Sequence, residues 1–355
     1  MSPDTLKHAA DFLHSRPNLK CAFLRAVVDV DAQFRVSEPG FRDSVTGPLI
    51  DALHLPDEIL RKQLSNGTVF EYLYRSKIAR EFTMSFPECP DHVWEPQTTK
   101  LLVHFARGAT TVVVGGAYFG DHAILIAREL LRSGGTVHAF EPNPDQRKML
   151  ERNASLNGLS NVVANAEGLW NLHRAQLALA GFDAFACTVD SQEGAVGSFQ
   201  TVRIDEYLSE RGAPPPQLIM IDSEGAEFRA LQGAERFLRL PVGKAPYLVF
   251  EIHSLYVDWS RGLANTDIVA WLEGLGYEVY AVRDFMANFA MTDQPVELVP
   301  CRTVYLEGPP HGFNMVAIKD KHLLDSPFFR IVPSVSPKLL LGRDPKLHLP
   351  LGGLH

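Results

Sequence analysis

The chain has 355 residues, of which 46% are hydrophobic and 21% are charged, an ordinary balance for a water-soluble globular protein. This length is enough for one large domain or two modest ones, each with a buried core. The formal net charge of −8 argues against a nucleic-acid backbone as the main partner.

The cysteines and the apolar runs indicate the compartment. Cys21, Cys89, Cys187 and Cys301 are far apart and form no C-x-x-C pair, which favours reduced thiols over a disulfide frame or a zinc site. No apolar run is long enough to cross a bilayer. Residues 1–16 lack the basic start and apolar core of a signal peptide. We therefore expect a soluble, cytoplasmic protein with no membrane partner.

Residues 1–93 have a mainly helical pattern that differs from the middle of the chain. Helices are predicted over residues 2–16 and 68–84, and the stretch 36–48 between them is irregular. The segment SFPECPDHVWEP, residues 85–96, contains three prolines and marks a boundary to the next unit.

From Thr110 onward, β-branched runs alternate with helical patterns. Strands are predicted over residues 110–116, 136–140, 161–165, 218–222, 247–253 and 277–282. The helix after the first strand places on one face Ala123, Ile126, Ala127, Leu130 and Leu131. Further helices are predicted over about 144–156, 226–238 and 266–276. This alternation predicts an α/β fold with a Rossmann-like, doubly wound, mostly parallel sheet.

The end of the chain contains two late strand patterns and a tail. Residues 302–308 and 313–319 are predicted as edge or antiparallel strands, and the proline-punctuated tail from Lys321 is predicted to wrap the surface or a partner. The predicted organisation is a helical region over 1–93, a central domain over 94–320 and a tail over 321–355.

The stretch VVVGGAYFGDH, residues 112–122, predicts a buried strand that enters a glycine-rich turn. Ligands of open α/β sheets bind at the carboxyl ends of strands, where glycine lets the backbone approach them closely. Glu141 follows 25 residues after Gly116 and can accept hydrogen bonds from both hydroxyls of a ribose. NAD and S-adenosylmethionine both fit this pattern, but the absence of G-x-G-x-x-G argues against an NAD-dependent oxidoreductase.

A second group of polar residues follows two later strands. Asp222 ends the strand LIMID, and Glu224 and Glu227 open the next helix, where capping is an equal explanation for Glu224 and the better one for Glu227. Glu251 and His253 are two residues apart on a strand and point to one face. If the two strands are neighbours, Asp222, Glu251 and His253 converge.

Two chemistries fit these three side chains. Histidine has an unperturbed pKa that suits the acceptance of a proton from a hydroxyl that receives a methyl group, and His253 is the candidate for this role. A histidine held by hydrogen bonds beneath a loop is the structural alternative. Oxygen ligands and an imidazole also suit a Mg- or Mn-like ion. No spacing demands a metal, so we favour an acid–base cluster without one.

Four blocks of the chain resemble the FkbM-type family of S-adenosylmethionine-dependent methyltransferases. They lie between about Trp94 and Tyr280 and read VVGGAYFGDH, VHAFEPNPDQRKMLERNASLNG, IMIDSEGAEFRALQGAERFL and LVFEIH. The resemblance implies a fold of the class I methyltransferase type and S-adenosylmethionine as cofactor. It implies that Glu141 holds the ribose, that residues 167–169 border the adenine and that residues 116–120 lie under the methionine part. The implied cofactor-binding residues are Gly116, Ala117, Tyr118, Gly120, Glu141, Pro142, Asn143, Glu167, Gly168, Leu169 and Asp222.

The glycine loop departs from the family pattern Asp-Val-Gly-Ala-Asn-x-Gly. Val114, Gly115 and Tyr118 replace the Asp, the Val and the Asn, which removes one carboxylate and one amide. Either Glu95 or Asp121 takes over, or affinity falls by about one to two orders of magnitude for a lost charge-assisted hydrogen bond.

The resemblance implies O-methylation of a hydroxyl on a glycan sugar or a secondary metabolite. N-methylation of a peptide side-chain amide and a non-catalytic binding protein with the same fold are the alternatives. The expected partner is a small-molecule, glycan or peptide acceptor. The N-terminal region and the tail are expected to supply acceptor specificity or a subunit contact in a homo-oligomer.

Overall fold

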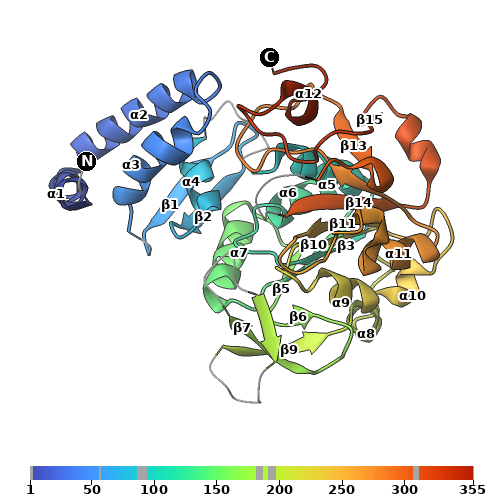
Figure 1. The fold of residues 1–355 in the computed structure, drawn as a ribbon. Helices are drawn as coiled ribbons and strands as arrows, with labels where there is room; N and C mark the ends of the chain where they lie inside the picture. The colour runs from blue at the N-terminus through green and yellow to red at the C-terminus, as the bar shows by residue number, and fades with distance from the viewer. Residues whose placement is uncertain are drawn as a thin grey trace.

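The computed structural model describes residues 3–55, 57–85, 94–180, 187–190, 197–306 and 312–354. Its centre is a nine-stranded sheet with the strand order β15-β13-β12-β14-β11-β10-β3-β4-β5 (Figure 1). The strands are β3 (Thr111–Gly115), β4 (Thr136–Phe140), β5 (Val162–Asn165), β10 (Leu218–Ile221), β11 (Tyr247–Ile252), β12 (Glu278–Val282), β13 (Val296–Pro300), β14 (Phe313–Ile318) and β15 (Phe329–Ile331).

The strands β11, β10, β3, β4 and β5 form the parallel half of the sheet. β3 lies between β10 and β4, and all five of its residues are buried. Such β-branched runs are typical of strands that are covered on both faces. The six strands predicted from the alternating pattern are confirmed, and so is the Rossmann-like, doubly wound, mostly parallel sheet.

The antiparallel part of the sheet differs from the prediction. β14 is antiparallel as expected, but it lies inside the sheet between β11 and β12. The strand predicted over 302–308 is wrong for the described residues 302–306, where a 3-10 helix, η4 (Cys301–Thr303), leads into irregular chain. There Tyr305 donates its backbone N–H to Val335 of the tail, so this segment packs on the tail and β13 joins the sheet instead.

Helices cover both faces of the sheet. One apolar cluster joins its first face to α5 (Pro96–Ala106), α6 (Ala123–Leu130) and α7 (Pro144–Leu156). A second cluster joins the other face to α8 (Ile204–Glu210), α9 (Glu227–Gln232), α10 (Glu235–Leu238) and α11 (Asp267–Gly274), with the short η3 (Leu263–Asn265) before α11. α7 has its predicted bounds, because the side chain of Asn143 accepts hydrogen bonds from the first free N–H groups.

Two details of the helix predictions are wrong. Leu131 follows the end of α6 and is exposed, so it is not part of the buried face. The helix predicted over 226–238 is broken at Gly233 into α9 and α10. The carbonyl of Gly233 accepts a hydrogen bond from the N–H of Asp205, and a side chain at Gly233 would overlap the carbonyl of Trp170, so a tertiary contact replaces the helical one.

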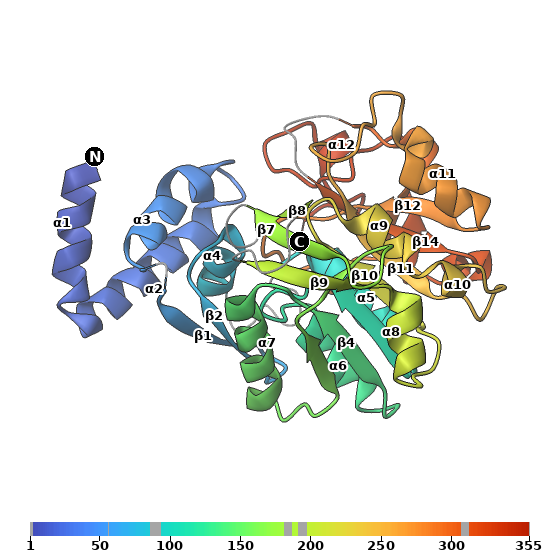
Figure 2. The ribbon, with the colours of Figure 1, turned by 90° about the horizontal axis from the view of Figure 1, so that it is seen from below.

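The N-terminal region contains α1 (Pro3–His14), α2 (Pro17–Phe34), a π-helix η1 (Arg42–Thr46), α3 (Gly47–Ala52), the hairpin β1 (Ile59–Gln63) and β2 (Val69–Leu73), and α4 (Lys77–Met84). Figure 2 shows α1 and α2 at the end of the molecule farthest from α11. The helix predicted over 2–16 is confirmed as α1, whereas the helix predicted over 68–84 is wrong in its first part, which is β2.

The strand β2 forms because both of its edges are paired. One edge pairs with β1, and the other bonds to two side chains of α7, one turn apart. The side chain of Asn157 accepts a hydrogen bond from the N–H of Val69 at 2.9 Å and donates to the carbonyl of Val69. In the same way, the side chain of Asn153 accepts from the N–H of Glu71 at 2.7 Å and donates to the carbonyl of Glu71. These satisfied backbone groups favour the extended form over a helix.

A small sheet and the tail complete the fold. The small sheet has the order β6-β9-β7-β8, formed by β6 (Gly168–Leu169), β7 (Gln176–Ala180), β8 (Cys187–Asp190) and β9 (Ser198–Val202). The tail contains η5 (Lys321–Asp325), β15 and α12 (Pro345–His348), and β15 pairs with β13. The division into 1–93, 94–320 and 321–355 stays a prediction.

Two of the predicted free thiols are described: Cys21 is exposed and Cys301 is buried. Cys89, the side chain of Cys187 and most of the proline-rich boundary, residues 86–93, lie outside the described residues. Within the described ranges, no helix has the length and apolarity that a membrane span requires.

Candidate active site

Two adjoining cavities open at the carboxyl ends of the parallel strands. The first, here the loop cavity, contains about 980 Å³ of empty space that is partly open to solvent. Eight of the predicted cofactor-binding residues line it: Gly116, Tyr118, Glu141, Pro142, Asn143, Gly168, Leu169 and Asp222. Leu177, Leu179 and Phe199 of the small sheet add an apolar wall.

The second cavity, here the acidic cavity, contains about 780 Å³ of empty space. Its polar wall includes Glu95, Asp222, Glu224, Glu251 and His253. Thus the three predicted catalytic residues do converge, because β10 and β11 are neighbours in the sheet. The two cavities share Ile78, Trp94, Asp222 and Glu224, so Asp222 lies at their junction.

The glycine loop runs directly against the end of β10. Gly116 has a left-handed backbone (φ +72°), and a methyl group on it would overlap the backbone carbonyl oxygen of Asp222. At Gly115, a Cβ would lie 2.7 Å from a methyl of Leu169. Gly116 therefore requires glycine, whereas a side chain at Gly115 would require Leu169, which lines the same cavity, to shift.

Val114, which replaces the family's acidic residue, faces the core. It is 1% exposed and lies in register with Met220 of β10 and Ala139 of β4. The loop therefore brings no carboxylate into the cavity at this position. Asp121 lines the loop cavity and Glu95 lines the acidic cavity, so carboxylates reach this region from other positions.

Glu141 is held in place before any ligand arrives. One carboxylate oxygen accepts from the N–H of Tyr118 and the other from the N–H of Asn143, each at 2.8 Å. Tyr118 has a left-handed backbone (φ +47°), and its hydroxyl donates to Ser76 of the N-terminal region at 3.0 Å. This arrangement fixes the Glu141 carboxylate on the cavity wall.

Three predicted cofactor-binding residues lie outside the lining of both cavities as far as the structure describes it: Ala117, Gly120 and Glu167. Ala117 is buried and donates its N–H to Phe140 at 3.0 Å. Gly120 packs against Ile124 and Leu150, where a Cβ would come within 2.9 Å of either side chain. These two residues shape the loop from behind.

Carboxylates crowd the junction of the two cavities. Burial, followed by the nearby negative charges, raises the pKa of Asp222 and of Glu251 well above the ordinary values. Burial also raises the pKa of Asp121 and of Glu224. The ligand-free cluster therefore holds protons more tightly than ordinary carboxylates do, and a bound cation or hydrogen-bond donor would relieve this crowding.

The positive charge of His122 partly balances the negative charge of this carboxylate cluster. Burial alone would lower its pKa, but the negative charges of Asp121, Glu95 and Asp222 outweigh burial and raise the pKa to about 9. Its Nε2 lies 3.6 Å from a carboxylate oxygen of Glu95, and its Nδ1 lies 3.2 Å from the hydroxyl of Thr99. The ring is thus a buried imidazolium at neutral pH.

We expect the unfolding free energy to fall by about 3 kcal/mol between pH 6.5 and pH 9 through His122 alone. The folded-state pKa is raised above the unfolded value, so this stabilisation is complete below pH 6.5 and is lost as the pH rises through about 9. Urea unfolding should show a shallower pH dependence for His122→Gln. His138→Gln is the matched control, because burial lowers the pKa of His138 to about 4, outside this window. Equal slopes for His122→Gln and wild type would contradict the assignment.

The ring of His253 is oriented by its own loop. Its Nδ1 accepts the N–H of Leu255 at 3.0 Å, so the neutral ring carries its proton on Nε2. In this orientation Nε2 is a hydrogen-bond donor, and a base role at Nε2 would require the loss of the Leu255 contact. The predicted role of His253 as a proton acceptor stays a prediction.

Glu251 carries a buried oxygen that is open to a ligand. Its side chain is 7% exposed, it lines the acidic cavity, and its Oε2 has no hydrogen-bond partner within the described part of the chain. Gly312 packs so closely on the other oxygen that a side chain there would overlap it. Buried oxygens are usually paired, so an unpaired one in a cavity points to a missing partner.

Glu227 has the structural role that we favoured for it. One of its carboxylate oxygens accepts the N–H of Ser223 at 2.9 Å, and both accept the N–H of Gly225 at 3.1 Å. Glu224 is different: it has a left-handed backbone (φ +49°) and lines both cavities.

A comparison with models of protein families matches residues 115–279 to the Methyltransferase FkbM domain. These residues form an FkbM methyltransferase domain. The matched range begins in the glycine loop and ends in β12, so it contains Glu141, Asp222 and Glu251. The predicted family is therefore confirmed for this part of the chain, while Glu95 and the N-terminal region lie outside the matched range.

Several solved structures are similar to the chain. The FkbM methyltransferase of Methylobacillus flagellatus KT is 13% identical, with 59% of this chain and 44% of that chain covered and a TM-score of 0.35. The precorrin-6y C5,15-methyltransferase of Geobacter metallireducens GS-15 is 16% identical, with 63% of this chain and 89% of that chain covered and a TM-score of 0.36. The O-methyltransferase of Bacillus cereus in complex with SAH is 15% identical, with 65% of this chain and 84% of that chain covered and a TM-score of 0.35. No curated protein matches the chain.

Residues outside the FkbM domain complete the acidic cavity. Ser76, Lys77 and Ile78 come from the start of α4, and Met286 comes from the chain that follows β12. Sequence reasoning missed these residues, because no motif marks them. It also assigned no role to His122, although this residue ends the block VVGGAYFGDH, because its charge depends on residues from other segments. The left-handed backbone of Glu95, directly before α5, is likewise invisible in the sequence.

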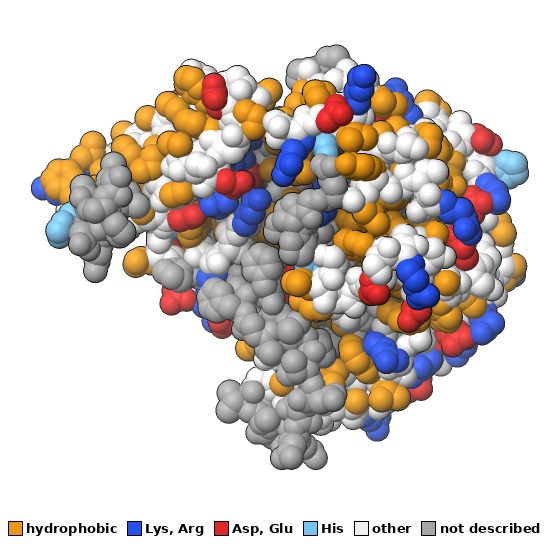
Figure 3. Space-filling model, in the orientation of Figure 1, with side chains coloured by type: hydrophobic (Ala, Val, Ile, Leu, Met, Phe, Trp, Pro, Cys, Tyr) orange, Lys and Arg blue, Asp and Glu red, His pale blue; other side chains and the backbone are white. Residues whose placement is uncertain are grey.

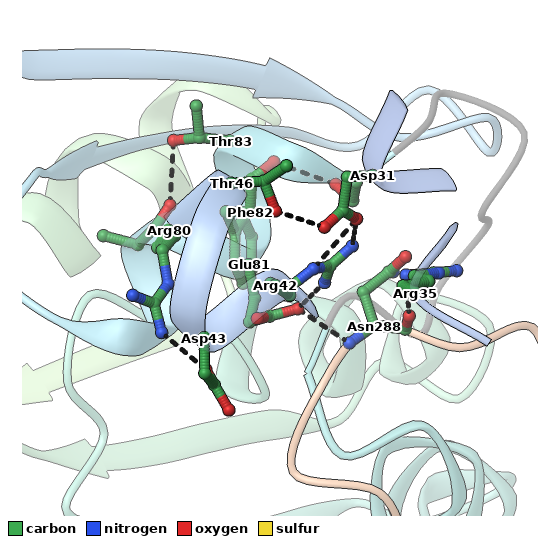
Figure 4. Close-up of polar contacts among 12 residues, drawn as sticks. Asp31, Arg35, Arg42, Asp43, Thr46, Arg80, Glu81, Phe82, Thr83 and Asn288 are labelled. Carbon is green, nitrogen blue, oxygen red and sulfur yellow. Dashed lines mark hydrogen bonds and ion pairs between the residues drawn. The ribbon is translucent and has the colours of Figure 1, made fainter. Parts of the chain in front are cut away.

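A buried ion cluster holds α4 and the chain after β12 together (Figure 4). Arg42 forms ion pairs with Asp31 and with Glu81 of α4. The N–H of Asn288 donates to Glu81 at 3.1 Å, and Arg35 donates to the carbonyl of Asn288 at 2.8 Å. The cluster thus fixes the N-terminal region against the loop that carries Met286.

Proposed function

We propose that the chain is an S-adenosylmethionine-dependent methyltransferase that methylates a hydroxyl on a glycan sugar or a secondary metabolite. The carrying observation is the pair of adjoining cavities with Asp222 at their junction. A methyl donor in the loop cavity and an acceptor in the acidic cavity would meet at this residue. Holding two reactants in line in this way contributes much of the rate of a transfer reaction.

The loop cavity has residues that fit the donor. The preorganised carboxylate of Glu141 lines the loop cavity and can accept hydrogen bonds from the ribose hydroxyls, because a carboxylate has about four acceptor positions. Leu169, Leu177 and Phe199 offer an apolar wall for the adenine. When bound, S-adenosylmethionine supplies a methyl group on a positively charged sulfur.

The positive charge of the donor fits the crowded carboxylates. Asp121 lines the loop cavity. Beside this cavity, a carboxylate oxygen of Glu95 lies 3.6 Å from Nε2 of His122. We assign to Asp121 and Glu95 the role of the acidic residue that Val114 replaces. A cation bound there lowers the pKa values of the nearby carboxylates, so donor binding should release protons.

The acidic cavity fits a hydroxylated acceptor. Carboxylate oxygens accept hydrogen bonds from hydroxyls, and Glu251 offers an unpaired buried oxygen. A carboxylate whose pKa is raised is also a stronger base than an ordinary carboxylate once it has lost its proton. We assign the removal of the acceptor proton to Asp222 or Glu251, with the Nε2–H of His253 as a positioning donor.

Calorimetry with S-adenosylmethionine and S-adenosylhomocysteine tests the donor site. We expect Glu141→Gln to weaken binding about 10- to 100-fold, because the amide keeps the shape but loses a charge-assisted acceptor. Glu151→Gln is the matched control and should change affinity less than about threefold, because Glu151 is an exposed residue of α7 outside the lining of both cavities. No binding of either compound at millimolar concentration would overturn the proposal.

Label transfer from methyl-labelled donor to a panel of glycans, hydroxylated metabolites and peptides tests the acceptor. Labelled ethers are the expected products, whereas labelled amides would favour the N-methylation alternative. Tight donor binding without transfer to any member of the panel would favour the non-catalytic alternative.

A further inference from the structure

The wall of the acidic cavity has more acidic than basic side chains. Four carboxylates line it, those of Glu95, Asp222, Glu224 and Glu251. The basic side chains of the wall are Lys77, which is exposed, and His253. On the face of the molecule in Figure 3, acidic and basic side chains are interspersed instead. The excess of carboxylates in the cavity is therefore a local feature.

One oxygen of this wall, Oε2 of Glu251, is buried without a partner. Glu251 is 7% exposed, and its Oε2 has no hydrogen-bond partner among the residues that the structure describes. Lys338 lies nearby, since the charge of Glu251 acts on its pKa, but Lys338 does not donate a hydrogen bond to this oxygen. Leaving a buried carboxylate oxygen unpaired costs free energy. Because Glu251 lines a cavity, a ligand is the source of the donor that this oxygen lacks.

The residue opposite Glu251 in the sheet leaves a second oxygen unpaired. Asn314 of β14 is in register with Glu251, so the two side chains point to the same face. The Nδ2 of Asn314 donates to Glu95 at 2.9 Å, but its Oδ1 has no partner in the described ranges. A protonated primary amine has three N–H donors, whereas a hydroxyl has one. Neighbouring acceptors without donors therefore suit an amine better than a hydroxyl.

The rest of the wall favours an organic cation over a metal ion. Within the described residues, no group of three His, Cys, Asp or Glu side chains is arranged to hold a metal ion. Ile78, Trp94 and Met286 make part of the wall apolar, and the cavity contains about 780 Å³ of empty space. The indole of a tryptophan also attracts cations over its face. An ammonium group on a carbon skeleton uses both the carboxylates and the apolar wall.

We infer that the acceptor in the acidic cavity is a hydroxylated amine, such as an amino sugar, whose protonated amine binds Glu251. This inference rests on the proposed function, which places the acceptor in this cavity. It leaves Asp222, at the junction of the two cavities, to take the proton of the hydroxyl. A bound ammonium lowers the pKa of nearby carboxylates, so it also favours the ionised form of Asp222 that this role requires.

Calorimetry at pH 7 with pairs of hydroxylated amines and their N-acetyl derivatives tests the amine site. The pairs are glucosamine with N-acetylglucosamine and ethanolamine with N-acetylethanolamine. We expect the amine of at least one pair to bind about 10-fold more tightly than its derivative, because acetylation removes the charge and leaves a single N–H donor. No such preference at amine concentrations up to about 10 mM would overturn the inference.

Glu251→Gln tests the residue that holds the amine. We expect this variant to bind the preferred amine about 10-fold more weakly, with less than a threefold change for the N-acetyl derivative. Binding of S-adenosylhomocysteine should also change less than about threefold, because Glu251 lines the acidic cavity and not the loop cavity. Glu151→Gln, on the exposed side of α7, is the matched control and should bind the amine as wild type does. Circular dichroism checks that each variant is folded.

The two binding measurements separate this inference from the proposed function. Amine binding that is equal in wild type and Glu251→Gln, with S-adenosylhomocysteine binding intact, would overturn the assignment of the amine alone. The same holds if label is transferred to neutral hydroxyl compounds and not to their amine counterparts. Absence of S-adenosylhomocysteine binding would instead overturn the proposed function and, with it, the acceptor role of the acidic cavity.

Discussion

Gly116→Ala is expected to lower the unfolding free energy by at least about 3 kcal/mol and to abolish donor binding. Two costs add at this position: the left-handed backbone, which an L-residue adopts at a cost of about 1–2 kcal/mol, and the overlap of the new methyl group with the carbonyl of Asp222. Relief of the overlap would move the glycine loop away from β10. The loop and Asp222 form adjoining walls of the loop cavity, so its shape would change as well.

Gly134→Ala separates the two costs. Gly134 has nearly the same backbone conformation (φ +68°), but a Cβ there would have no atom within 4 Å. This control should lose only about 1–2 kcal/mol in denaturant unfolding and should bind S-adenosylhomocysteine as wild type does. If Gly116→Ala is as stable as Gly134→Ala and still binds, the close packing of the loop on Asp222 is not what holds the site.

The parts of the fold that the sequence predicts well are those in which local pattern and tertiary role agree. The apolar runs at residues 112–114 and 218–221 are fully buried, and such continuous apolar runs are typical of strands that are covered on both faces. The common location of the glycine loop and Glu141 is also predictable, because each follows a parallel strand and the carboxyl ends of neighbouring strands meet at one edge of the sheet.

The parts that the sequence does not predict depend on residues far apart in the chain. β2 is extended because Asn153 and Asn157, more than 80 residues away, bond its backbone, and the helical periodicity of residues 68–84 contains no trace of this. The charge of His122 has the same kind of origin. It depends on Glu95 and Asp222, which only the completed sheet brings close.

The same distinction applies to the candidate site. Asp222, Glu251 and His253 are predictable because each follows or ends a recognisable strand. The walls from α4 and from Met286 belong to segments with no motif, and a buried ion cluster around Arg42 positions them. Acceptor specificity therefore depends on the part of the site with the weakest sequence signal.

Arg283→Met is expected to destabilise the protein by about 3–5 kcal/mol and to release the tail. Arg283 is fully buried directly after β12, and its Nη1 pairs with Glu297 of β13 at 2.5 Å. Its other nitrogens donate to the tail carbonyls of Ser336, Leu347 and Leu349 at 2.8–2.9 Å. Methionine fills a similar volume but leaves these carbonyls and the carboxylate without their donor.

Arg302→Met is the matched control for this prediction. Arg302 pairs with Glu273 at 3.2 Å, but 73% of its side chain is exposed, so its loss should cost less than about 1 kcal/mol. Urea unfolding measures both costs, and limited proteolysis should cut the tail of Arg283→Met first. A difference of less than about 1 kcal/mol between the two variants would show that the tail is held by its apolar contacts instead.

Release of the tail should also change the acidic cavity. The tail residue Lys338 is buried, and burial lowers the pKa of its amine to about 8. The negative charge of Glu251 acts in the opposite direction on the pKa of Lys338, which indicates that the two side chains lie close together. One residue after Arg283, Asp284 accepts the N–H groups of Gln97 and Thr98 at the start of α5, next to Glu95. Arg283→Met should therefore weaken donor binding in a folded sample, whereas Arg302→Met should not. Unchanged binding in both variants would separate the tail from the site.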